Sequence, residues 1–114
     1  MTKNSDGIIK SQKTIDKIVV IELAGEIEMN CAMQLREAIS DAMGDGSTVV
    51  LNMAAVDFMD SSGLATLVEA LQRSRKEGKR LKLSGMNKRV KSIFEISRLE
   101  SIFDIYETEE EAIA

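Results

Sequence analysis

Hydrophobic residues along this chain follow two alternating periods, one of two residues and one of about 3.6, which are the periods of strands and helices. Residues 17–23 are rich in β-branched side chains, and both faces of the strand that they predict are apolar. A weaker strand is predicted over Ile8–Ile15, with a turn near Asp16, and Gly25 is expected to end the stronger strand. Three further strands are predicted over residues 48–53, 80–84 and 103–106.

Between these strands the apolar residues recur at helical spacing. The stripe over residues 30–43 predicts a helix that begins at Asn30, whose side chain is a suitable N-terminal cap. The spacing of Thr108 and Glu111 is that of a capping box and predicts a short terminal helix. Two more helices are predicted, one from Leu64 until Gly78 and one from Asn87 to Ser97.

The order of these elements favours an α/β fold. Strands and helices alternate from residue 48 onward, which implies right-handed crossovers and parallel neighbouring strands. The first two strands are expected to form a hairpin at the sheet edge. We therefore predict a single domain over residues 1–114, with its core over about residues 8–113 and a mixed, largely parallel sheet of about five strands with about four helices.

Composition and charge exclude several classes of function. A net charge of −4 argues against a nucleic-acid binder. No run approaches the roughly 18 apolar residues that span a bilayer, and the polar start lacks the apolar centre of a secretory signal, so a cytoplasmic protein without a membrane partner is expected. Cys31 is the only cysteine and histidine is absent, so neither a Ser-His-Asp nor a Cys-His site can be built within this chain.

The segment from Val56 to Leu64 combines acids, two serines and a glycine just before a predicted helix. A serine oxygen at a helix start can accept a hydrogen bond from the unpaired amides of the first turn, and a phosphate is favoured there for the same reason. The residues alone therefore leave Ser61 and Ser62 open between capping and function. Asp57 and Asp60 fit turn formation and capping better than catalysis, because no second acidic cluster or pocket signature accompanies them.

The run Met59-Asp60-Ser61-Ser62-Gly63-Leu64 resembles the phosphorylation loop of the STAS-domain anti-sigma factor antagonists. The strand and Gly-Glu turn of that family are matched by residues 23–27, and its basic, apolar third helix is similar to residues 88–94. The similarity extends over about residues 8 to 113. Glu28 stands where the family often has an aspartate, and the following Met29-Asn30-Cys31 departs from the family pattern.

The resemblance implies a phosphorylation site at Ser61, modified by a partner anti-sigma factor that is itself a serine kinase. It implies that Asp60 positions the Ser61 hydroxyl or assists its deprotonation, and that Gly63 admits the kinase. A serine phosphatase would reset the protein, and the ATP and magnesium would belong to the kinase, so no catalytic residue, cofactor or metal is expected on this chain. The expected partner-binding residues are Glu26, Glu28, Asp57, Phe58, Met59, Asp60, Ser62, Gly63 and Leu64.

The resulting hypothesis is a non-enzymatic anti-sigma factor antagonist that releases a sigma factor when unphosphorylated. Two alternatives stay open at this point. One is a STAS subunit of another regulatory or transport assembly in which Ser61 is never modified. The other is a small serine-dependent enzyme, which the absence of histidine disfavours.

Overall fold

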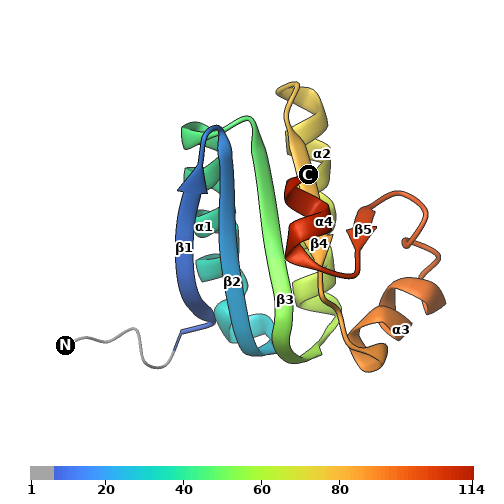
Figure 1. Ribbon diagram of the computed structural model, residues 1–114. Coiled ribbons are helices and arrows are strands. Elements are labelled where there is room, and N and C mark those ends of the chain that lie inside the picture. Colours follow the sequence, from blue (N-terminus) through green and yellow to red (C-terminus); the bar gives the residue numbers. More distant parts are fainter. Residues whose placement is uncertain (1–6) are drawn as a thin grey trace.

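Five strands form one mixed sheet whose spatial order, β1-β2-β3-β4-β5, follows their order along the chain (Figure 1). The computed structural model describes residues 7–114, so residues 1–6 of the expected domain lie outside the described part. β1 and β2 are antiparallel and the other neighbours are parallel, as predicted. The strands are β1 (Ile9–Ile15), β2 (Ile18–Ile27), β3 (Thr48–Met59), β4 (Arg80–Ser84) and β5 (Asp104–Tyr106).

Helices cover both faces of this sheet, but unequally. The larger core lies between the sheet and three helices, and the fully buried Ile21, Leu51 and Phe94 belong to it. On the opposite face, Val20 and Val50 pack against Ala112 of the short terminal helix, so both faces of β2 are buried as its sequence predicted. The helices are η2 (Met29–Cys31, a 3₁₀ turn), α1 (Ala32–Asp45), α2 (Ser61–Lys76), α3 (Lys88–Ile96) and α4 (Glu109–Ile113). None of the helices within residues 7–114 is both long and apolar enough to cross a bilayer.

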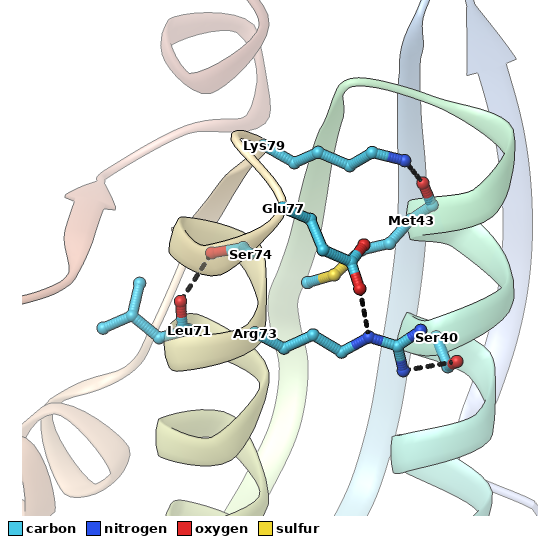
Figure 2. Close-up of polar contacts among 7 residues, drawn as sticks. All are labelled: Ser40, Met43, Leu71, Arg73, Ser74, Glu77 and Lys79. Atoms are coloured by element: carbon cyan, nitrogen blue, oxygen red, sulfur yellow. Dashed lines mark hydrogen bonds and ion pairs between the residues drawn. The ribbon is translucent and has the colours of Figure 1, made fainter.

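Polar side chains join α1 and α2 along their C-terminal halves (Figure 2). The Arg73 guanidinium donates to Ser40 Oγ on α1 at 2.7 Å and to the Glu77 carboxylate at 2.8 Å. The Lys79 ammonium donates to the Met43 carbonyl in the last turn of α1, where a cation is also favoured by the helix dipole. These contacts link the C-terminal ends of the two helices, whose buried apolar residues pack in the same core.

The beginning of the first helix differs from the prediction. Asn30 is not the cap of α1; it is exposed in the 3₁₀ turn η2, and Cys31 occupies the N-cap position. The Cys31 thiol accepts a hydrogen bond from the Glu28 backbone N–H at 3.2 Å. The spacing of apolar residues does not predict this contact. The extra turn carries the chain from the end of β2 into α1.

The two central strands are longer than predicted. β2 continues through Gly25, which has a φ of 88° within the strand, and β3 continues to Met59 instead of ending at Met53. The pairing of β2 with β3 shifts register between Glu22 and Ala24 and again between Gly25 and Glu26. Such irregularities break the two-residue alternation, which is why the sequence pattern ended early. The sequence placed residues 54–63 between the predicted strand and the predicted helix, but only Asp60 separates β3 from α2.

Candidate functional site

The conspicuous serines lie where β2 and β3 end and α2 begins. The Asp60 backbone N–H donates to the Ile27 carbonyl at 3.1 Å, which ties the start of α2 to the last residue of β2. Because the two strands are parallel, their carboxyl ends meet at this edge. Open α/β sheets commonly place their binding sites at this edge of the sheet.

Asp60, and not a serine, caps α2. Its Oδ1 accepts hydrogen bonds from the Ser62 N–H at 2.9 Å and the Gly63 N–H at 3.1 Å, so two of the unpaired amides of the first turn are satisfied. The capping interpretation of Ser61 is therefore wrong. Ser61 is the first residue of α2 and is exposed, whereas Ser62 is half-buried.

Three of the expected partner-binding residues are directed into the protein. Met59 is fully buried and Leu64 is nearly so, although both were expected to bind a partner. A Cβ built on Gly63 would lie 2.8 Å from Ile27 Cγ2 and 2.8 Å from Met59 Cγ. The glycine is thus required for packing within this chain, and this contact accounts for it without the partner that the resemblance implied.

Exposed and half-buried acids around Ser61 form an acidic surface. Glu26, Glu28, Asp57 and Asp60 come from the ends of β2 and β3 and the connections that follow them. A hydrogen bond with Glu26 raises the pKa of Glu28, and partial burial and the nearby charges of Glu26 and Asp60 raise it further. Proximity of like charges has this effect because it disfavours a second ionised carboxylate. Residues 7–114 nevertheless contain no group of three or more His, Cys, Asp or Glu side chains placed to hold a metal ion.

An open groove of about 640 Å³ begins at Ser61 and runs along the exposed side of α2. Ala65 and Val68 of α2 line it, Met29 and Ala32 form one wall, and Leu99 contributes from the segment after α3. Met29 is 75% exposed and Met33, one turn further along α1, is 65% exposed. Exposed apolar side chains beside a groove are typical of protein-binding surfaces.

Sequence reasoning missed these two methionines. Met59 was the methionine expected to contact a partner, but it is buried, as are Met43 and Met53, whereas Met29 and Met33 are exposed. The unusual residues 29–31 after the end of β2 were the available signal, because they differ from the family pattern where the groove begins.

The sequence has two groups of basic residues, one over residues 73–80 and one over residues 88–91, and their surroundings differ. In the first, Arg73 pairs with Glu77 at 2.8 Å and Arg80 with Asp104 at 3.2 Å, so these charges belong to solvated ion pairs at the far end of α2. In the second, Lys88 and Arg89 are exposed at the start of α3.

Hydrogen bonds of Asn87 place the start of α3 against β3. The Asn87 side chain caps α3 by accepting from the Val90 N–H at 2.8 Å, and it donates to the Val56 carbonyl of β3 at 3.0 Å. The basic residues that follow Asn87 therefore lie across the end of β3 from the acidic residues of β2.

Comparison with known proteins gives this fold and site a family. The STAS domain model matches residues 10–112, so the chain belongs to the STAS domain family. The anti-sigma-B factor antagonist of Bacillus subtilis is 32% identical over 87 residues, which are 76% of this chain and 80% of that protein. The anti-sigma-B factor antagonist of Staphylococcus aureus is 29% identical over 95 residues, which are 82% of this chain and 88% of that protein.

Solved structures agree with this assignment. The anti-sigma factor antagonist SpoIIAA in its unphosphorylated form superimposes with a TM-score of 0.77 at 29% identity, over 90% of this chain and 91% of that one. The phosphorylated form of the Bacillus cell fate determinant SpoIIAA gives 0.71, also at 29% identity, over 90% and 95%. A Thermotoga maritima protein gives 0.84 at 24% identity, over 90% of both chains, and supports the fold alone. The chain is thus similar to regulatory proteins of bacteria over most of its length.

Proposed function

We propose that this protein is an anti-sigma factor antagonist controlled by phosphorylation of Ser61. In its unmodified form it binds an anti-sigma factor that is a serine kinase, and the sigma factor is released. Transfer of phosphate to Ser61 ends the binding, and a serine phosphatase restores it. The observation that carries this proposal is the position of Ser61, an exposed hydroxyl on the first residue of α2, in a chain similar to a protein solved with and without phosphate.

The local hydrogen bonds determine how a phosphate on Ser61 would be held. Asp60 already occupies the amides of Ser62 and Gly63, so these donors are not free for the phosphate. Glu28 and Asp60 add like charge nearby, as the raised pKa of Glu28 reflects. The phosphate would therefore project into solvent and act on whatever contacts this surface, with no rearrangement of α2.

The electrostatic energies are sufficient for a switch. Phosphorylation adds about −1.5 to −2 charges at neutral pH. Two unit charges ~5 Å apart interact by about 3 kcal/mol at an effective dielectric constant near 20. Changing a complex from almost fully bound to almost fully free requires roughly 5.5 kcal/mol of differential affinity. A phosphate that meets one or two partner carboxylates reaches that value.

Phosphosite mapping by mass spectrometry tests the proposal. The protein is recovered from its own cells during growth and stress, alongside Ser61→Ala and Ser62→Ala variants expressed in the same way. We expect one phosphate whose occupancy changes with condition, which is absent from Ser61→Ala and present in Ser62→Ala. Absence of phosphate under every condition, with phosphatases inhibited, would refute the switch and favour a constitutive subunit.

A binding titration tests the direction of the switch. Ser61→Ala should retain affinity for the anti-sigma factor, whereas Ser61→Asp and the authentic phosphoprotein should lose it. Equal affinity of the unmodified and phosphorylated proteins would contradict the charge argument.

A further inference from the structure

The outer side of β1 is an unpaired sheet edge. Within residues 7–114, β1 pairs with β2 alone, and Figure 1 shows it as the outermost strand. Six of its seven residues are exposed. An edge strand presents free backbone N–H and C=O groups, which can pair with a strand from another chain. This edge lies outside the surface that the proposed function uses.

The hairpin with β2 determines which backbone groups of β1 point outward. Ile15 lies opposite Ile18 across a two-residue turn, so these two residues form a hydrogen-bonded pair of the antiparallel ladder. Hydrogen-bonded pairs alternate with non-hydrogen-bonded ones along the ladder. The N–H and C=O groups of Gln12 and Thr14 therefore point away from β2. Gln12 is also the middle residue of the strand.

The helices of the larger core do not cover this edge. Gln12 and Thr14 lie opposite Ile21 and Val19, whose side chains belong to that core, yet Gln12 and Thr14 are both exposed. The helical layer therefore stops before β1, which leaves room beside it for a further strand.

The two lysines of β1 do not leave the edge charged. Lysine on an edge strand usually discourages pairing with a further strand. Here the Lys10 ammonium pairs with Glu22 at 3.6 Å, and the Lys13 ammonium pairs with Glu109 at 2.8 Å. Glu22 belongs to β2 and Glu109 to α4, so each lysine is drawn back over the sheet and compensated within its own chain.

We propose that β1 pairs with β1 of a second copy of this chain, antiparallel and about a twofold axis at Gln12. In this register Lys10 lies opposite Thr14 and Lys13 opposite Ser11, so no lysine faces a lysine and all seven residues are paired. The outward groups of Gln12 meet those of the other Gln12. An axis at Lys13 would oppose two lysines, and an axis at Ser11 would leave part of each strand unpaired.

The ends of the strand also favour a second copy over another extended segment. Ile15 is 39% exposed, and in this register it lies close to the half-buried Ile9 of the other copy at each end of the pairing. The register irregularity that follows Ile9 lies at these ends and not at the axis. The two Lys13 side chains are diagonal neighbours across the axis, but each is held by the Glu109 of its own chain.

This dimer leaves the Ser61 surface free. β2 separates β1 from β3, and the twofold axis turns the copies head to tail, so the two Ser61 residues lie at opposite ends of one continuous sheet. The contact comprises a single strand from each copy, which corresponds to the weak class of interfaces that bury less than about 1,200 Å². The dimer depends neither on phosphorylation of Ser61 nor on an anti-sigma factor.

Sedimentation velocity over a range of protein concentrations tests the dimer. We expect a concentration-dependent equilibrium between monomer and dimer. Gln12→Pro removes the outward N–H at the axis, which the hairpin with β2 does not use, and should stay monomeric. Gln12→Ala keeps the backbone N–H and should dimerise like the wild type.

Charged residues at the twofold axis provide the decisive arm. Gln12→Lys and Gln12→Glu each oppose like charges and should dimerise several-fold more weakly than the wild type. Their equimolar mixture should associate more strongly than either variant alone. Gln72→Lys makes the same change at an exposed position of α2 and should dimerise like the wild type.

Circular dichroism checks the folding of each variant, and the charged variants decide the test if Gln12→Pro does not fold. Three results would overturn the proposal. They are a monomer at every concentration, a folded Gln12→Pro protein that dimerises like the wild type, and a mixture of the charged variants that associates no better than its components.

Discussion

Asp60 caps α2 and also lies directly beside the proposed phosphorylation site. It closes the first turn of α2 through the Ser62 and Gly63 amides, and it directly precedes the exposed Ser61. Because the carboxylate is engaged with the backbone, it holds the helix start in place whether or not a partner is present. Ser61 is therefore presented by a fixed segment.

Replacing Asp60 with alanine should lower the free energy of unfolding by about 1 kcal/mol, the usual loss for a helix N-cap. Asparagine keeps an oxygen acceptor at the same place, so Asp60→Asn should retain most of that stability. Urea denaturation of the three proteins measures the difference. A stable Asp60→Ala protein would show that the two hydrogen bonds contribute little.

Glycine at position 63 should prove irreplaceable for steric reasons. A Cβ there would press on Ile27 and Met59 at 2.8 Å, so Gly63→Ala should destabilise the protein by about 1–3 kcal/mol despite alanine's better helix propensity. Gly44 in α1 is the matched control because a Cβ there has nothing within 4 Å. Gly44→Ala should stabilise by about 0.4–1 kcal/mol. Thermal unfolding of both variants should therefore shift in opposite directions.

How much of the site was predictable from the sequence differs from residue to residue. The motif identified Ser61 and Asp60 because their types and order carry chemistry. It left the cap open between the serines and Asp60, since both serine and aspartate are good caps and only the backbone decides which one sits at the N-cap position. Phe58 and Met59 were both expected to bind a partner, but only Phe58 is exposed, because the bulged register of β3 directs Met59 inward.

At the scale of elements, α4 is held by polar contacts in addition to the packing of Ala112 on Val20 and Val50. The Lys13 ammonium pairs with Glu109 at 2.8 Å, the Asn52 amide donates to the same carboxylate at 2.8 Å, and the Lys82 ammonium donates to the Ala112 carbonyl at 2.8 Å. A helix of five residues has little stability of its own, so these contacts decide whether it stays docked.

The docking of α4 should weaken in acid. The hydrogen bond from Lys13 and then that from Asn52 lower the pKa of Glu109 below its ordinary 4.5. A lowered pKa means that the stabilisation is present above the ordinary value and is lost as the pH falls through the lowered one. Hydrogen exchange of residues 109–113, corrected for the intrinsic effect of pH, should therefore rise on acidification. Glu109→Gln should show fast exchange already at neutral pH, whereas Glu110→Gln, the same change one residue along, should not.

The elements themselves were largely predictable. Apolar strands and helical stripes are periodic, so the existence and order of the strands and of α1 to α4 follow from the sequence. The ends of these elements do not follow from the sequence, because β2 and β3 continue through register shifts that interrupt the two-residue alternation. The 3₁₀ turn before α1 was missed for a similar reason: a thiol contact of Cys31 organises it.

At the scale of the whole molecule, modification of Ser61 should leave folding unchanged. Ser61 is exposed and the core lies behind Met59 and Leu64, so Ser61→Glu should alter the free energy of unfolding by no more than about 0.5 kcal/mol. The urea midpoint and slope should match the wild type even where partner binding is lost. A large loss of stability would instead show that a negative charge at Ser61 acts by destabilising the fold.

The single residue between β3 and α2 constrains how such a chain can evolve. An insertion or deletion at Asp60 would turn α2 by about 100° relative to the sheet, since a helix has about 3.6 residues per turn. Leu64, Leu67 and Leu71 would then leave the core that now buries them. Related chains can therefore vary this site by substitution but not in length. Changes of length are tolerable instead in exposed positions such as residues 100–101, within the connection from α3 to β5.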